Sequence, residues 1–219
     1  VLIIAEHLNG QLNSATARCV TCAQALNAEG IEVLVLSHAG QAIAEQAAKI
    51  SGVSKVIFAD NAANEHAIAQ VLAPQIVELA KGYSHVFGPS TTFGKDLMPC
   101  VAALLGTAQV SDVMSVESSY SFKRPIYAGN AIITVNAPAE QIVVATVRTA
   151  SWPAADMNGS ASVESVSTSA ALPSHTRFVS LQQGKSDRPD LQSASKVVSG
   201  GRALGSAENF AIVYSLADK

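Results

Sequence analysis

Three short stretches carry residue types that could do chemistry, and the first is a pair of cysteines. Cys19 and Cys22 form a C-x-x-C motif, which is typical of a redox dithiol at a helix start, where the helix dipole lowers a thiol pKa. Here the pair lies about a turn and a half inside an expected helix. Because cysteine is also a common small core residue, we favour a structural role. Thiol redox chemistry is the alternative.

The second stretch is the sequence GPSTTFGKD at residues 88–96. It lies between an expected strand and an expected helix, and parallel sheets bind ligands at the carboxyl ends of their strands. Backbone N–H groups and hydroxyls could hold a phosphate there, although the spacing of a Walker A motif is absent. We favour a tight turn capped by Ser or Thr. A nucleotide-binding module that uses residues 88–95 is the alternative.

The third stretch, Gly200-Gly201-Arg202, stands between an expected strand and an expected helix. Its glycines would let the backbone approach a pyrophosphate, and the guanidinium supplies forked donors. The pattern is not G-x-G-x-x-G. On pattern alone, a glycine turn with a surface arginine is the better explanation, although this stretch is the strongest local signal in the sequence.

The other polar residues give weaker indications of a functional site. Glu6-His7 and Asp60-Asn61 end expected strands, and a carboxylate beside a histidine can do acid–base work, but ordinary loop polarity is the simpler interpretation. Asp112, Arg124 and Arg148 lie in or beside expected strands, where an arginine is usually paired or at an interface. We therefore expect no catalytic residue and no metal site. The remaining histidines fit neither a Ser/His/Asp order nor zinc spacing; they are His38, His66, His85 and His175.

The order of elements in the first half predicts a doubly wound α/β layer. Apolar strands alternate with helices, which indicates a mostly parallel, Rossmann-like sheet covered on both faces. Ser14 is the expected N-cap of the first helix, Gly30 its stop signal, and Pro74 should kink or divide the third. The expected strands cover residues 1–6, 31–36, 55–59 and 85–88, and the helices 14–28, 42–50, 65–80 and 93–105.

After Gly106 the pattern becomes rich in Val, Ile, Thr and Tyr without helices. Residues 110–117, 122–136 and 141–148 predict an antiparallel extension at the sheet edge, with 136–140 as a hairpin loop. The Ser/Ala-rich residues 158–171 predict a linker or surface excursion, and 177–181 a short strand. The polar segment 184–191 suggests a boundary. We expect a domain at 1–185, a linker at 186–195, and a truncated second domain at 196–219 with a strand (196–199) and a helix (206–219) capped by Ser206.

Composition excludes several classes. The 219 residues are 48% hydrophobic and 14% charged with a net charge of −3, so a disordered chain is excluded and no basic stripe suggests nucleic acid. No apolar run is long enough to span a bilayer, and the N-terminus lacks the pattern of a signal peptide. Three cysteines favour a reducing compartment over a disulfide framework.

Six segments together form a recognisable pattern. They are VLIIAEH (1–7), GPSTTFGKDLMP (88–99), RPIYAGNA (124–131), VRT (147–149), SDRPDL (186–191), and VVSGGR with ENF (197–202 and 208–210). In this order they resemble the alpha subunit of electron transfer flavoproteins. The resemblance covers the whole chain.

This resemblance implies an electron carrier without catalytic residues. Such proteins are alpha/beta heterodimers with one FAD, which carry electrons from the acyl-CoA dehydrogenases of fatty-acid β-oxidation to a membrane quinone oxidoreductase. They lie in the bacterial cytoplasm or the mitochondrial matrix. The first domain packs on the beta subunit, which also holds AMP, so residues 88–94 are not assigned to AMP.

The resemblance also implies FAD-binding residues. Arg202, with Gly200 and Gly201, aligns with the family's FAD-contacting S-G-G-R segment. The other flavin contacts fall beyond Lys219, so we expect this chain alone to bind FAD weakly or not at all. Two residues depart from the family: Ala203 replaces a usual Gly and would be strained if its φ were positive. Cys100 replaces a common Arg, which could remove a contact to the partner subunit or the neighbouring domain.

Overall fold

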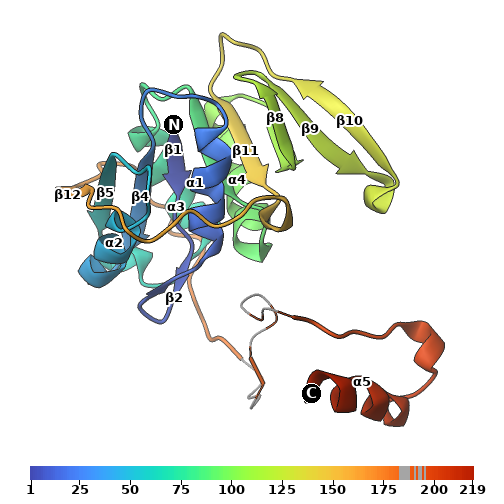
Figure 1. Ribbon diagram of the computed structural model, residues 1–219. Coiled ribbons are helices and arrows are strands. Elements are labelled where there is room, and N and C mark those ends of the chain that lie inside the picture. The colour runs from blue at the N-terminus through green and yellow to red at the C-terminus, as the bar shows by residue number, and fades with distance from the viewer. Residues whose placement is uncertain (183–187, 190, 192–193, 195) are drawn as a thin grey trace. The chain divides into compact units, whose positions relative to one another are not determined.

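The computed structural model describes residues 1–182, 188, 189, 191, 194 and 196–219. They form two units, Val1–Phe178 and Val179–Lys219. The first unit is built on a seven-stranded sheet with helices on both faces (Figure 1). This confirms the expected α/β class.

All neighbouring strands of the central sheet are parallel. Their order is β12-β5-β4-β1-β6-β11-β7. Ile3 and Ile4 of β1 are both fully buried, in the hydrophobic clusters on opposite faces, because helices cover both sides of such a sheet. The strands are β1 (Leu2–Ile4), β4 (Glu32–Ser37), β5 (Lys55–Asp60), β6 (His85–Pro89), β7 (Gln109–Val113), β11 (Val143–Val147) and β12 (Ser162–Val166).

Four helices cover the sheet near their expected positions. α1 (Ala15–Gln24) and α2 (Gln41–Ala48) pack on one face, and α3 (Ala69–Leu79) and α4 (Thr92–Leu105) on the other. Ser14 is the N-cap residue of α1 but makes no side-chain cap bond; Asn13 Oδ1 accepts from Ala15 N–H instead, at 2.9 Å. α1 ends at Gln24, well before Gly30. Pro74 lies inside α3 without dividing it, and a 3-10 turn, η1 (Ala62–Asn64), comes before that helix.

Two predictions about the sheet edge were wrong. Residues 141–148 do not form a hairpin with the preceding strand, because β11 lies between β6 and β7 and is parallel to both. All five of its residues are buried, as expected for an inner parallel strand. The expected linker at 158–171 contains β12, which pairs with β5. β12 is an edge strand with mostly exposed side chains, so its sequence lacks an apolar run.

A separate antiparallel sheet, β10-β9-β8, confirms the expected extension and projects from the first unit (Figure 1). It consists of β8 (Ser115–Ser118), β9 (Ser121–Ile126) and β10 (Ala131–Asn136). The stretch expected as one strand at 122–136 is a hairpin with the 3-10 turn η2 (Tyr127–Gly129) at its tip. A small ribbon, β2 (His7–Leu8) with β3 (Gln11–Leu12), follows β1.

The second unit contains only short helical elements among its described residues. They are the 3-10 turns η4 (Arg202–Leu204) and η5 (Glu208–Phe210), and α5 (Ala211–Ala217). The strands expected at 177–181 and 196–199 do not form, and the described part of this unit holds no other strand with which they could pair. The expected helix at 206–219 begins at Ala211, with Phe210 rather than Ser206 as N-cap.

Most of the expected linker at 186–195 falls outside the described residues, as does part of the segment SDRPDL. Among the described residues, none of the helices has both the length and the hydropathy that crossing a membrane requires.

Candidate functional site

The loop at residues 88–96 lies at the switch point of the central sheet. β4 and β6 flank β1 on its two sides, so the strand order reverses between β1 and β6, and open α/β sheets bind ligands at such a point. The loop follows β6 and leads into α4. The sequence therefore located this feature correctly.

The geometry of this loop supports the capped turn. Thr91 is the N-cap of α4, and its Oγ accepts from the backbone N–H of Gly94 at 3.4 Å. The same hydroxyl donates to Glu6 Oε2 at 2.8 Å. Glu6 is partly buried, and this burial raises the pKa of its carboxyl group. A carboxylate of the chain itself therefore stands at the helix N-terminus where a phosphate would bind, which disfavours the nucleotide-binding alternative.

The remaining strand-end residues do not form an acid–base pair. His7 Nε2 lies 2.8 Å from the carbonyl oxygen of Leu36, not on Glu6. Asp60 accepts from Ala39 N–H at 2.9 Å and lies 3.8 Å from His38 Nδ1. The bond to Asp60 fixes Ala39 in a left-handed conformation, with φ 51°. These groups are loop contacts, as the simpler interpretation expects.

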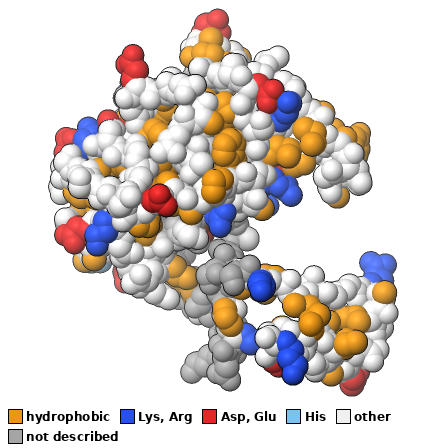
Figure 2. All heavy atoms as spheres, viewed as in Figure 1, with side chains coloured by type: hydrophobic (Ala, Val, Ile, Leu, Met, Phe, Trp, Pro, Cys, Tyr) orange, Lys and Arg blue, Asp and Glu red, His pale blue; other side chains and the backbone are white. Residues whose placement is uncertain are grey.

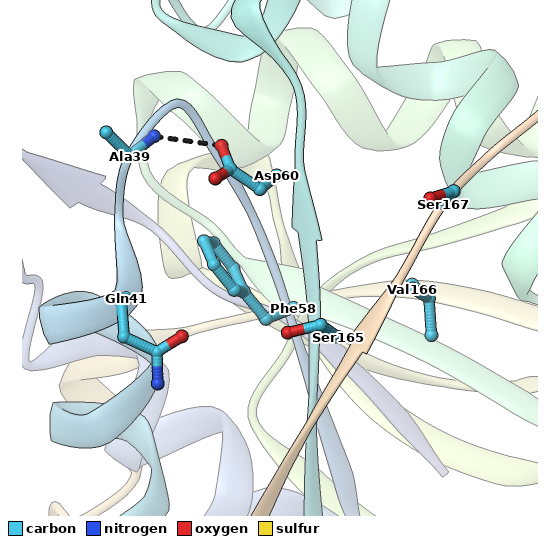
Figure 3. A pocket seen from close by; sticks show the side chains of 7 residues that line it. All are labelled: Ala39, Gln41, Phe58, Asp60, Ser165, Val166 and Ser167. Carbon is cyan, nitrogen blue, oxygen red and sulfur yellow. Dashed lines mark hydrogen bonds between the residues drawn. The ribbon is translucent and has the colours of Figure 1, made fainter.

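Asp60 also lines a pocket of about 440 Å³ at the carboxyl ends of β5 and β12 (Figure 3). The Asp60 carboxylate is directed toward Ala39, and the Gln41 amide lies at the start of α2. The lining supplies hydrogen-bonding groups but no nucleophile with a base beside it. Its residues are Ala39, Gln41, Phe58, Asp60, Ser165, Val166 and Ser167.

The two arginines beside the strands are paired, as expected. Arg148 Nη1 lies 2.8 Å from Asp112 Oδ2, and Arg124 Nε donates to the carbonyl oxygen of Ser111 at 2.7 Å. Within the described ranges, no three His, Cys, Asp or Glu side chains gather at metal-binding distances.

The C-x-x-C pair lies in the core. Cys19 and Cys22 are both free thiols with no exposed surface. Burial raises the pKa of both, so neither has the accessible thiolate that a redox dithiol needs. Cys100 is partly exposed on α4 and donates weakly to the carbonyl oxygen of Asp96 at 3.5 Å. The geometry therefore supports the interpretation of Cys19 and Cys22 as structural core residues.

Thiol reactivity should follow this burial. In the native chain, we expect Ellman's reagent to modify one thiol rapidly, that of Cys100, and all three only in denaturant. The variant Cys100→Ser should reduce the rapid native reaction to almost nothing. Fast native modification of Cys19 or Cys22, located by peptide mass spectrometry, would show that the pair is accessible.

The segment Gly200-Gly201-Arg202 is a surface turn within the second unit. Gly201 accepts at its carbonyl oxygen from Leu204 N–H at 3.0 Å and begins the 3-10 turn η4. A Cβ on Gly201 would meet nothing within 4 Å, whereas one on Gly200 would collide with the Leu204 side chain. Arg202 is exposed. The turn therefore leaves open backbone beside a guanidinium, an arrangement that fits one edge of an anion.

The structure shows the surroundings of the two residues that depart from the family pattern, Ala203 and Cys100. Ala203 lies inside η4, and the residue of this segment with a positive φ is Gly205, at 77°. Alanine at 203 therefore carries no backbone strain. Cys100 lines an apolar groove between α3 and α4, beside Pro74 and Leu104.

Comparisons with known proteins support the resemblance that the six sequence segments carry. The family model "Electron transfer flavoprotein domain" matches residues 1–172. An electron transfer flavoprotein subunit alpha from Pseudomonas aeruginosa is 50% identical over 220 residues, covering 100% of this chain and 70% of the relative. The corresponding subunit from Paracoccus denitrificans is 46% identical with the same coverage. The mitochondrial subunit alpha from Dictyostelium discoideum is 38% identical over 232 residues, covering 99% of this chain and 65% of the relative. The chain belongs to the electron transfer flavoprotein family.

Proposed function

We propose that this chain is the alpha subunit of an electron transfer flavoprotein and works as an electron carrier in a heterodimer with a beta subunit. The observation that carries the proposal is the 50% identity to a subunit alpha along the full chain. In this proposal one FAD accepts electrons from acyl-CoA dehydrogenases and passes them to a membrane quinone oxidoreductase. AMP belongs to the beta subunit. The setting is the bacterial cytoplasm or the mitochondrial matrix.

The proposed roles follow the order of the domains along the chain. We propose a first domain at 1–185, a linker at 186–195, and the opening of an FAD-binding domain at 196–219. Redox chemistry is supplied by the flavin, while the protein orients it and tunes its electrostatics. Arg202 would donate to an anionic or carbonyl edge of FAD, and Gly200 and Gly201 would admit its close approach. The open turn at Gly201 supports this assignment.

The experiment is to purify the chain with its beta subunit and measure flavin. We expect FAD absorbance from a complex whose alpha subunit continues past Lys219 to the length of its relatives, and little FAD on the 219-residue chain alone; the Arg202 variants are therefore made in the longer subunit. Arg202→Ala should weaken FAD binding to the complex by about 10- to 100-fold, the value of one charge-assisted hydrogen bond. Release of FAD, followed by its fluorescence, measures this.

Two variants make the result specific. Arg202→Lys should recover only part of the affinity, because a lysine lacks the forked donors. Arg177→Ala removes another exposed arginine and should leave FAD binding unchanged. Equal FAD affinity of Arg202→Ala and the unmodified chain would remove Arg202 from the site.

A further inference from the structure

The pocket at the carboxyl ends of β5 and β12 is formed on one face of the central sheet. Ser165 of β12 pairs in register with Phe58 of β5, so their side chains project from the same face. Asp60 and Ser167, two residues farther along, also line the pocket, and Gln41 borders it from the start of α2. Because the two serine side chains are small, a hollow of about 440 Å³ remains at this edge of the sheet.

The rim of this pocket is held in place by Asp60. Its Oδ1 accepts from the backbone N–H of Ala39, which has the left-handed conformation that residues with a Cβ rarely adopt. The next residue, Gly40, is buried, and a Cβ there would collide with the Ser37 side chain. Backbone strain of this kind concentrates at functional positions. The tight loop thus fixes the half-exposed Asp60 carboxylate at the edge of the hollow.

The polar groups that remain open in the pocket are mostly hydrogen-bond acceptors. Gln41 donates from Nε2 to Glu45 Oε1 at 3.3 Å, which leaves Gln41 Oε1 as an acceptor. Figure 3 shows this oxygen directed toward the Phe58 side of the pocket. In the part of the chain that the structure describes, Asp60 Oδ2 and the two serine hydroxyls form no hydrogen bond. A ligand rich in donors would therefore find partners here.

The segments that form the pocket are acidic. Residues 31–48, 56–80 and 162–176 contain six Asp or Glu side chains and no Lys or Arg. Two of the six pair with Lys55, which lies at the opposite end of β5, whereas Asp60 lies in the pocket itself. Figure 2 shows acidic and basic side chains scattered over the visible face, without one large patch of either charge. A preference for cations is therefore local to the pocket.

We propose that this pocket binds the ammonium group of a linear primary amine. An ammonium group carries one charge and three donors, which match the Asp60 carboxylate and the oxygens of Gln41 and Ser165. The methylene stem of the amine would lie against the Phe58 ring, which also attracts a cation. A metal ion fits less well, because a single carboxylate beside an aromatic ring does not supply the oxygen ligands that a hard cation needs.

The test is a titration of the ¹⁵N-labelled 219-residue chain with cadaverine, followed by NMR. It is done at constant ionic strength and pH 7.5, where an ordinary histidine is mostly neutral. We expect saturable shifts of the backbone amide signals of Ala39, Gln41 and Ser165, with a dissociation constant of about 1 mM. The neutral analogue 1,5-pentanediol should produce no such shifts, because it lacks the charge.

Two sources carry such an ammonium group, a free amine and the lysine side chain of another protein. Nα-acetyl-lysine-N-methylamide presents the group as a protein does. Tighter binding of this compound than of cadaverine would assign the pocket to a protein lysine, and weaker binding would assign it to a free amine.

Two variants test the charge and the space separately. Asp60→Asn keeps the oxygen that accepts from Ala39 N–H but removes the charge, so the dissociation constant for cadaverine should rise at least about tenfold. Ser165→Leu fills the hollow and should abolish the saturable shifts, while the melting temperature stays nearly unchanged because the residue is exposed at the sheet edge. The matched control is Glu140→Gln, which removes one exposed charge before β11, at the other end of the parallel strands, and should change the constant less than about twofold.

Four results would overturn the inference. They are unchanged affinity of both Asp60→Asn and Ser165→Leu, an equal loss in Glu140→Gln, equal binding of 1,5-pentanediol, and tighter binding of Ca²⁺ than of cadaverine at the same amides. Shifts that are spread over the whole surface and do not saturate would likewise show that the chain has no amine pocket.

Discussion

Replacing Gly94 by alanine is expected to destabilise the first unit by about 3 kcal/mol, near the upper end of the usual cost of overpacking. Gly94 lies in the first turn of α4, where alanine would otherwise favour the helix by about 1 kcal/mol. A Cβ at this position, however, would collide with the carbonyl oxygen of Pro89 at the end of β6. Pro89 is held in turn by its pairing with Val147 of β11. Neither backbone can yield without moving a helix or a central strand.

Thermal unfolding measures this effect. For a unit of this size, the melting temperature should fall by roughly 6–12 °C. Gly30→Ala is the matched control, because its Cβ would meet only Ser54 Oγ at an ordinary 3.6 Å; it should leave the melting temperature nearly unchanged. A Gly94→Ala variant as stable as the unmodified chain would mean that α4 and β6 are not packed this closely.

This glycine shows what the sequence could and could not reveal. The loop at 88–96 was located from the sequence because the strand and helix that flank it have clear periodicities. Its backbone N–H groups and hydroxyls suggested a possible phosphate site, whereas the structure uses Gly94 for the contact between α4 and β6. The bond from Thr91 to Glu6 could not be foreseen, since it depends on β1 lying beside β6, and the strand order is a tertiary property.

The wrong predictions for β11 and β12 have opposite causes. β11 has a fully apolar run, VVATV, which is typical of a buried parallel strand, but the short loop with Pro138 favoured a local hairpin. In fact the chain crosses from the projecting sheet back into the central one. β12, with the sequence SVESV, has only two apolar residues because it lies at the sheet edge. Its pairing with β5 stabilises it where its composition does not.

The buried cysteines were the opposite case, in which composition was enough. Small residues surround Cys19 and Cys22 in the expected helix, and the structure places both in the core. For the turn at Gly200–Arg202, composition gives no comparable support to the prediction. The strand expected before it is absent, because strand propensity alone does not form a strand without a neighbour.

Replacing Phe122 by alanine is expected to cost about 3–5 kcal/mol, as for other fully buried phenylalanines. Phe122 is the fully buried residue by which the projecting sheet packs into the main core, beside the partly buried Val116 and Val135. Its ring is fully buried and stands edge-on to Phe87 of β6, with ring centroids 6.3 Å apart, and near His85 at 6.4 Å. The loss should appear as a lower melting temperature and as faster amide hydrogen exchange throughout β9 and β10, since their attachment to the domain is weakened.

Two further variants separate the causes of this loss. Lys123→Ala changes the next residue, which faces the other side of the sheet and pairs with Glu117 at its surface; such a pair contributes about 0–1 kcal/mol. Phe122→Leu keeps much of the buried volume and should cost clearly less than alanine. If hydrogen exchange in β9 and β10 stayed unchanged in Phe122→Ala, the hairpin would be held by other contacts.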